Sequence, residues 1–168
     1  MRVLAKIAAA LLALSTIAAV PYQPEKIVLL QPDAVLRERV PSVQLLSDYI
    51  KAIQAAAQQA LSTETPHPTS GFLVLAVRPA GQSMVWLDFT PSLPEPTAAK
   101  LKKAVLAVPP FEARQGVVVF ALSSSLWGAA PSQGFPNPPE WRKAMQGHNA
   151  PLEVGSLVNS LWPGRPGT

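Results

Sequence analysis

The segment 98–122 constrains the fold of this chain more than any other part of the sequence. It begins with an amphipathic stretch whose apolar residues recur at helical spacing. These residues are Ala98, Leu101, Ala104, Val105 and Val108. Pro109 and Pro110 follow and cannot continue a helix, because proline lacks a backbone N–H and clashes with the preceding turn. The β-forming run 116–122 then predicts a strand that lies beneath the helices.

A longer helix is predicted earlier in the chain, over 41–61. Pro41 and Ser42 suit the start of a helix. Its apolar residues alternate in spacings of three and four, which is typical of a helix that packs one face on a core. This stripe consists of Val43, Leu46, Ile50, Ile53, Ala57 and Ala60.

Between the two helices the sequence predicts a β-hairpin. The strands are expected at 72–78 and 83–89, separated by the turn PAGQ at 79–82. Proline presets one backbone dihedral of this turn and Gly81 can adopt positive φ. The first strand is apolar on both faces, which indicates a central position, whereas Asp88 indicates a half-exposed second strand.

Together these segments predict an α+β fold of two layers, in which a three-stranded antiparallel sheet packs against two helices. We expect this domain at 33–127, beginning with a short helix at 33–40. An extended lead-in at 20–32 precedes it, in which 26–30 could add a short strand. The proline-rich residues 128–168 predict a partly helical C-terminal extension.

Residues 1–19 have the layout of a secretory signal peptide. A basic head, Arg2 and Lys6, precedes an apolar stretch that is shorter than the roughly 18–20 residues needed to span a bilayer. Cleavage is expected after Ala18 or Ala19, with an uncleaved membrane anchor as the alternative. We therefore expect a periplasmic or secreted bacterial protein with no stable membrane span after signal cleavage.

Composition excludes several classes of protein. The chain contains no cysteine, which rules out a disulfide framework and a lipid-modified N-terminus. Signal removal would leave 12 Lys and Arg against 10 Asp and Glu, a formal charge of +2 instead of +4. The basic residues are scattered and do not alternate with aromatic residues, so nucleic-acid binding is not expected.

The order helix, hairpin, helix, strand over 43–122 resembles the C-terminal domain of the TonB/TolA family. The stretches that carry the resemblance are VRPAGQ at 77–82 and AAKLKKAVLAVPPFEARQGVVVFAL at 98–122. The resemblance implies two helices on a three-stranded antiparallel sheet, and a sheet edge that meets a segment of a receptor.

This chain departs from the family pattern in three ways. The Tyr-Pro that commonly precedes the domain is absent, and TPSLPEPTAAKL replaces the family's Ser-Gly…Leu-Asp stretch. Only about twenty residues separate the signal from the first helices, which at ~3.3 Å per residue cannot bridge a periplasm. The energy-transducing role of the family is therefore not expected.

No catalytic or metal-binding motif stands out. His67 and His148 are expected in loops without a second ligand at metal spacing, so neither a metal nor another cofactor is predicted. The serines at 123–125 follow the last strand without a Gly-x-Ser-x-Gly motif, and we interpret them as a polar strand end. A hydrolase would need Asp88, a histidine and a serine to converge in one cleft.

The last predicted strand is the candidate partner-binding site. If this strand lies at the sheet edge, its backbone can pair with an extended peptide of another protein. We assign this role to Val117, Val119 and Ala121. The alternative is that the tail from Gly128 onward folds back and covers the edge.

A second candidate surface is a basic face on the later helix. Lys100, Lys102 and Lys103 lie off its apolar stripe and could meet an acidic partner or an anionic lipid. The alternative is that these lysines are simply solvated.

These observations favour a non-enzymatic protein-binding or adaptor module of the bacterial cell envelope, whose partner is another envelope or periplasmic protein. Within the binding class, the alternative is an immunity-type inhibitor of a toxin enzyme in the periplasm. From a different class, a small hydrolase is the remaining alternative.

Overall fold

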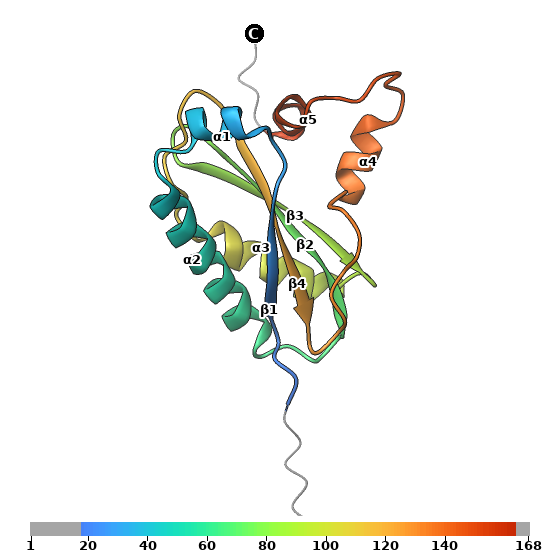
Figure 1. Ribbon diagram of the computed structural model, residues 1–168. Coiled ribbons are helices and arrows are strands. Elements are labelled where there is room, and N and C mark those ends of the chain that lie inside the picture. Colours follow the sequence, from blue (N-terminus) through green and yellow to red (C-terminus); the bar gives the residue numbers. More distant parts are fainter. Residues whose placement is uncertain (1–17, 164–168) are drawn as a thin grey trace, which may run out of the picture.

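The computed structural model describes residues 18–163, so most of the predicted signal peptide lies outside the described residues. The four strands of this part of the chain are β1 (Gln23–Leu29), β2 (Thr69–Arg78), β3 (Gln82–Thr90) and β4 (Val118–Leu126). Its five helices are α1 (Asp33–Arg39), α2 (Val43–Leu61), α3 (Glu95–Leu106), α4 (Pro139–Met145) and α5 (Val154–Leu161). The predicted α+β class is confirmed (Figure 1).

The strands form one antiparallel sheet in the order β1-β4-β2-β3. The predicted hairpin is present as β2 and β3, and its first strand is central, as expected. The predicted three-stranded sheet packed against two helices has fewer elements than the described structure. The additional strand, β1, comes from the predicted lead-in, and α4 and α5 come from the predicted C-terminal extension.

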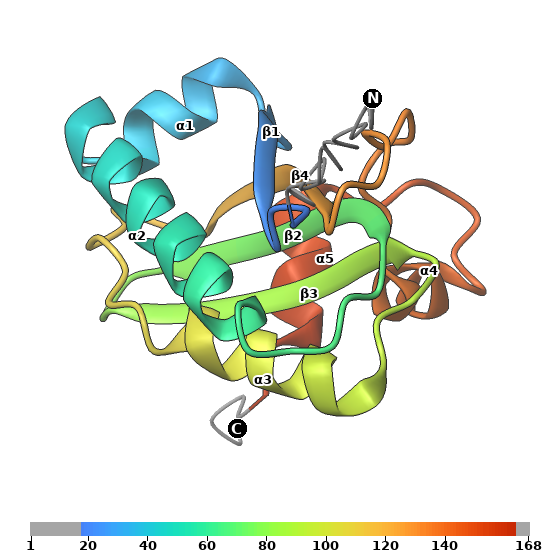
Figure 2. The ribbon, with the colours of Figure 1, turned by 90° about the horizontal axis from the view of Figure 1, so that it is seen from below.

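Helices cover both faces of the sheet, so the described part of the chain has three layers instead of the predicted two (Figure 2). Strand β2 contributes side chains to both cores because successive residues of a strand point to opposite faces. Leu73 and Leu75 face α1, α2 and α3, whereas Phe72 and Val74 face α4 and α5. The two-faced apolar pattern of this strand is explained by these two cores.

Helix α2 begins as predicted, because the Ser42 hydroxyl accepts a hydrogen bond from the Leu45 N–H at 3.1 Å. Its apolar stripe is buried from Ile50 to Ala60. Val43, the first residue of the predicted stripe, is 83% exposed instead. The N-terminal part of α2 therefore carries apolar side chains, such as Val43 and Leu45, that no other described element covers.

The abrupt end of α3 places β4 in the middle of the sheet. After Pro109 and Pro110, Phe111 packs its ring edge-on against Tyr49 with the ring centroids 5.7 Å apart. Gly116 then passes close to Arg39, since a Cβ at this glycine would lie 3.0 Å from the guanidinium carbon. This turn brings the chain into β4 beside β2.

A side chain extends the pairing between β1 and β4. Gln31 is buried, its Nε2 donates to the Val117 carbonyl oxygen at 3.1 Å, and its Oε1 accepts from the Val119 N–H at 2.9 Å. The amide of Gln31 thus replaces the main-chain bonds that a longer β1 would make. Among residues 18–163, none of the helices is both long and apolar enough to cross a membrane.

Candidate functional site

The prediction that the last strand is a sheet edge was wrong. Strand β4 pairs with β1 on one side and with β2 on the other. Val117, Val119 and Ala121 are buried, and α4 and α5 cover this face of the sheet. The alternative, that the tail covers this edge, is also incorrect, because β1 pairs with β4 there and the tail covers a face of the sheet. The free edges of the described sheet are β1 and β3.

Part of β1 directs unpaired backbone groups outward. The Leu30 N–H donates to the Val119 carbonyl oxygen at 3.4 Å, so the backbone of Leu30 points toward β4. Because these directions alternate along an antiparallel strand, Val28 also points toward β4, whereas Ile27 and Leu29 point away from it. The N–H and C=O groups of these two residues are therefore available to another strand.

The side chains of the same two residues form one wall of an apolar groove. Ile27 pairs with Leu122 and Leu29 pairs with Phe120, and both partners belong to the core on the α2 side. Ile27 and Leu29 thus face the α2 side, yet they are 50% and 53% exposed.

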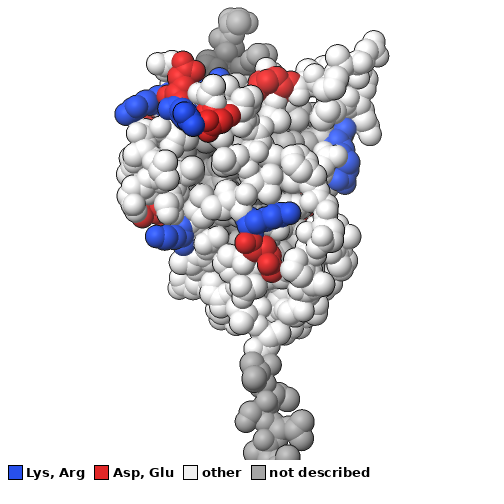
Figure 3. Space-filling view, viewed as in Figure 1, with Lys and Arg blue, Asp and Glu red and all other residues white. Residues whose placement is uncertain are grey.

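The groove lies between β1 and α2 and has a volume of about 520 Å³. Its lining residues are Ile27, Leu29, Val43, Leu46, Ser47, Ile50, Lys51 and Gln54. Figure 3, in the same view as Figure 1, shows few charged side chains over β1 and α2. We call this surface the β1–α2 groove. An exposed apolar groove of this kind is a candidate interaction site.

The first half of β1 is protected against pairing. Pro24 has no N–H to donate, and a β-bulge lies between Pro24 and Ile27. Glu25 and Lys26 occupy this bulge, and the Ser125 hydroxyl donates to the Glu25 carboxylate at 2.9 Å. Proline, bulges and charges are the devices by which edge strands avoid unwanted pairing. Only the second half of β1 is an open edge.

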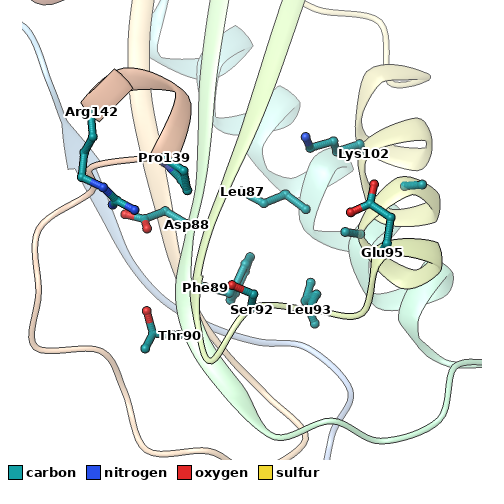
Figure 4. A pocket seen from close by; sticks show the side chains of 12 residues that line it. Leu87, Asp88, Phe89, Thr90, Ser92, Leu93, Glu95, Lys102, Pro139 and Arg142 are labelled. Atoms are coloured by element: carbon teal, nitrogen blue, oxygen red, sulfur yellow. The ribbon is translucent and has the colours of Figure 1, made fainter. Parts of the chain in front are cut away.

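A second hollow lies at the opposite edge, between β3, α3 and α4, and has a volume of about 350 Å³ (Figure 4). Asp88 accepts a hydrogen bond from the Asn137 N–H at 2.7 Å, and Arg142 donates to the Asn137 carbonyl oxygen at 2.5 Å. Figure 4 shows Arg142 pointing toward Asp88, and Glu95 and Lys102 on α3. These contacts fasten the start of α4 to β3.

The groups that a hydrolase would need do not converge in this hollow. Asp88 and Ser92 line it, but neither His67 nor His148 does. The serines at 123–125 are buried inside β4. Among the described residues, no group of three His, Asp or Glu side chains could hold a metal ion.

The strongest pKa shift belongs to a buried structural group. Burial raises the pKa of Tyr22 to about 12. The nearby Ser124 hydroxyl offsets part of this effect, although its geometry falls short of a hydrogen bond. Burial likewise raises the pKa of Tyr49, which packs in the core on the α2 side.

The three lysines of the predicted basic face lie in two different surroundings. Lys100 pairs with Glu64 at 2.7 Å, and its hydrogen bond holds the pKa of the Glu64 carboxyl below its usual value. Lys102 lies 3.9 Å from Glu140 of α4 and lines the hollow beside β3. Lys103 borders a shallow depression between α2 and α3, which Lys100 also lines. Lys100 and Lys103 therefore share one surface, whereas Lys102 lies beside the hollow at β3.

Comparisons with known proteins found no match for the chain: no protein-family model matches it, and neither does a curated protein or a solved structure. The resemblance to the TonB/TolA C-terminal domains stays a prediction.

Proposed function

We propose that this chain is a non-enzymatic protein-binding module of the bacterial cell envelope, which adds an extended segment of another envelope protein to the open half of β1. One observation carries the proposal. Ile27 and Leu29 present unpaired backbone groups at a sheet edge and exposed apolar side chains in the groove beside it.

Strand addition requires both of these features. Main-chain hydrogen bonds to the sheet edge supply affinity, and pockets for alternate side chains supply selectivity. One wall of the β1–α2 groove is a strand edge, and the other is the apolar side of α2, from Val43 to Ile50. This combination favours an extended segment over a helix, because a helix satisfies its own backbone groups and would leave the edge unpaired.

The location in the cell envelope rests on residues 1–19, whose basic head and short apolar stretch favour export. Non-enzymatic binding is supported by the character of the groove. Its lining is mostly aliphatic, and Lys51 is its one charged member.

Selection from a displayed library of random twelve-residue peptides tests this function. Isotope-labelled full chain would be titrated with the selected peptides, and the amide signals that move would be mapped. We expect the largest shifts at Ile27, Leu29 and the adjacent side of α2. Selected peptides that bind elsewhere, for example beside Asp88, would overturn the proposal.

A matched pair of substitutions on α2 separates binding from folding. Ser47 lines the groove, whereas Ala55 is exposed on α2 outside the groove lining. Ser47→Trp is expected to fill the groove and weaken binding at least tenfold, while Ala55→Trp should leave affinity unchanged. Both variants should keep the circular dichroism spectrum of the parent. Equal affinity of the two variants would contradict the proposed site.

A further inference from the structure

We infer that the segment bound at the β1–α2 groove is short, carries two apolar residues two positions apart, and has an acidic residue that contacts Lys51. This inference rests on the proposed function and specifies the chemistry of the partner.

The length follows from the two ends of the open edge. On one side, Pro24 and the bulge at Glu25 and Lys26 interrupt pairing. On the other side, the chain leaves the sheet after Leu29 and enters α1 at Asp33. The open edge therefore spans about three residues, or about 10 Å at ~3.3 Å per residue. A partner can form only a few ladder hydrogen bonds here.

The apolar spacing follows from the direction of the side chains. Ile27 and Leu29 face the same side of the sheet because they are two residues apart. An added strand places every second side chain on that side, above the edge and against α2. Leu46 and Ile50 form the α2 wall at this level. Two apolar residues of the partner, separated by one residue, would fill the space between the two walls.

The acidic residue follows from the charge of the lining. In Figure 1, α2 runs in the opposite direction to β1, so Lys51 and Gln54 lie toward the start of β1. Lys51 is exposed and makes no ion pair with any of the described residues. The lining of the groove is thus apolar toward Leu29 and carries its one charged side chain, Lys51, toward the other end. A carboxylate of the partner is the complementary group at that end.

The test uses capped peptides of about ten residues with an alternating valine and threonine core. They differ in the two residues at one end, which are both glutamate, both glutamine or both lysine. Each peptide is made in two versions, with these two residues at the N-terminus or at the C-terminus. Binding to the full chain would be measured at low salt from amide shifts. We expect the glutamate peptide to bind about two- to fivefold more tightly than the glutamine peptide, and the lysine peptide to bind most weakly.

Charge reversal provides the decisive control. Lys51→Glu should invert the order of the glutamate and lysine peptides, whereas Lys103→Glu makes the same charge change outside the groove and should not. The preference should shrink as salt is added, since exposed charges are screened. Inversion by Lys51→Glu alone would support the inference.

The outcomes distinguish this inference from the proposed function. If the peptides move the amide signals of Ile27 and Leu29 but bind with equal affinity whatever their charge, the acidic residue of the partner is overturned. Strand addition at β1 would still be supported. Shifts that extend along β1 to Gln23 would overturn the short pairing. If none of the peptides binds, or if Ser47→Trp does not affect their binding, both the inference and the proposed function are overturned.

Discussion

The two free edges of the sheet are protected in different ways. The edge of β3 is flanked by α3 and α4, and Asn137 ties α4 to Asp88 at this edge. The edge of β1 has no such cover in the described structure, and only Pro24 and the adjoining bulge blunt it. Edge strands that stay exposed invite pairing with other chains. The open edge of β1 beside an apolar groove therefore favours a role in binding, whereas the covered edge of β3 favours a role in the stability of the fold.

The comparison predicts that the β3 side depends on close backbone contact. Gly71 of β2 pairs with Phe89 of β3, and a Cβ at Gly71 would lie 2.0 Å from the Asp88 carbonyl oxygen. Gly71→Ala should therefore force β2 and β3 apart and destabilise the protein by about 4 kcal/mol or more. Urea unfolding of the full chain measures this effect. A loss below about 1 kcal/mol would show that the β2–β3 pair tolerates separation.

Proline substitutions distinguish the inner from the outer side of β1. The N–H of Val28 points toward β4, so Val28→Pro should cost about 3 kcal/mol through a lost ladder bond and a buried carbonyl without a partner. The N–H of Leu29 points outward, so Leu29→Pro should change the free energy of unfolding by less than about 1 kcal/mol. Leu29→Pro should nevertheless abolish peptide binding. Equal unfolding midpoints for the two variants would refute the assigned backbone directions.

A substitution at Gln31 tests whether its side-chain amide replaces main-chain hydrogen bonds beyond the end of β1. Gln31→Leu keeps the approximate size but leaves the Val117 carbonyl and the Val119 N–H without this partner. We expect a loss of about 2 kcal/mol, because unsatisfied buried groups are costly. Arg39 still donates to the Val117 carbonyl at 2.8 Å, which limits the damage. Hydrogen exchange at Val119 should accelerate, and unchanged protection would contradict the role of the Gln31 amide.

The smallest expected effect concerns the face of the sheet opposite the groove. Burial alone would raise the pKa of Glu153, but hydrogen bonds from the Gly155 and Ser156 N–H groups outweigh it, so this pKa is lowered. The ionised cap therefore stabilises α5 above the ordinary carboxyl pKa, and this contribution is lost as pH falls through the lowered value. We expect Glu153→Gln to cost about 0.5 kcal/mol at pH 7 and less at pH 3. If Glu153→Gln lowered the free energy of unfolding more at pH 3 than at pH 7, the proposed role of the ionised cap would be contradicted.

Much of the fold could be predicted because local patterns determine it. The continuous apolar run at 72–78, the turn at Gly81 and the double proline after α3 are each recognisable from neighbouring residues alone. Strand β1 is weaker in the sequence because the bulge at Glu25 and Lys26 shifts its alternation by one residue. Its partner β4 lies about a hundred residues away, and such pairing leaves no local signal.

The second core and the groove were harder to foresee. Trp141 and Leu157 lie on short helices bounded by prolines and loops, where too few turns exist for a clear periodicity. The β1–α2 groove depends on the position of α2 relative to β1, which the pattern of either element does not contain. Val43 continues the apolar stripe of α2 and was predicted to face the core, so the sequence did not indicate that it would line a groove.

The pairing of β1 with β4 also determines when the sheet can be completed. Among the described strands, the first, β1, pairs only with the last, β4, so Ile27 pairs with Leu122 from far along the sequence. When the chain emerges N-terminus first from a ribosome or a translocation channel, β1 emerges early. It can pair only after β4 has also emerged. Until then, β2 and β3 can pair only with each other. Removal of β1 would leave one side of β4 unpaired, whereas a chain that ends before β4 would leave β1 and one side of β2 without a partner.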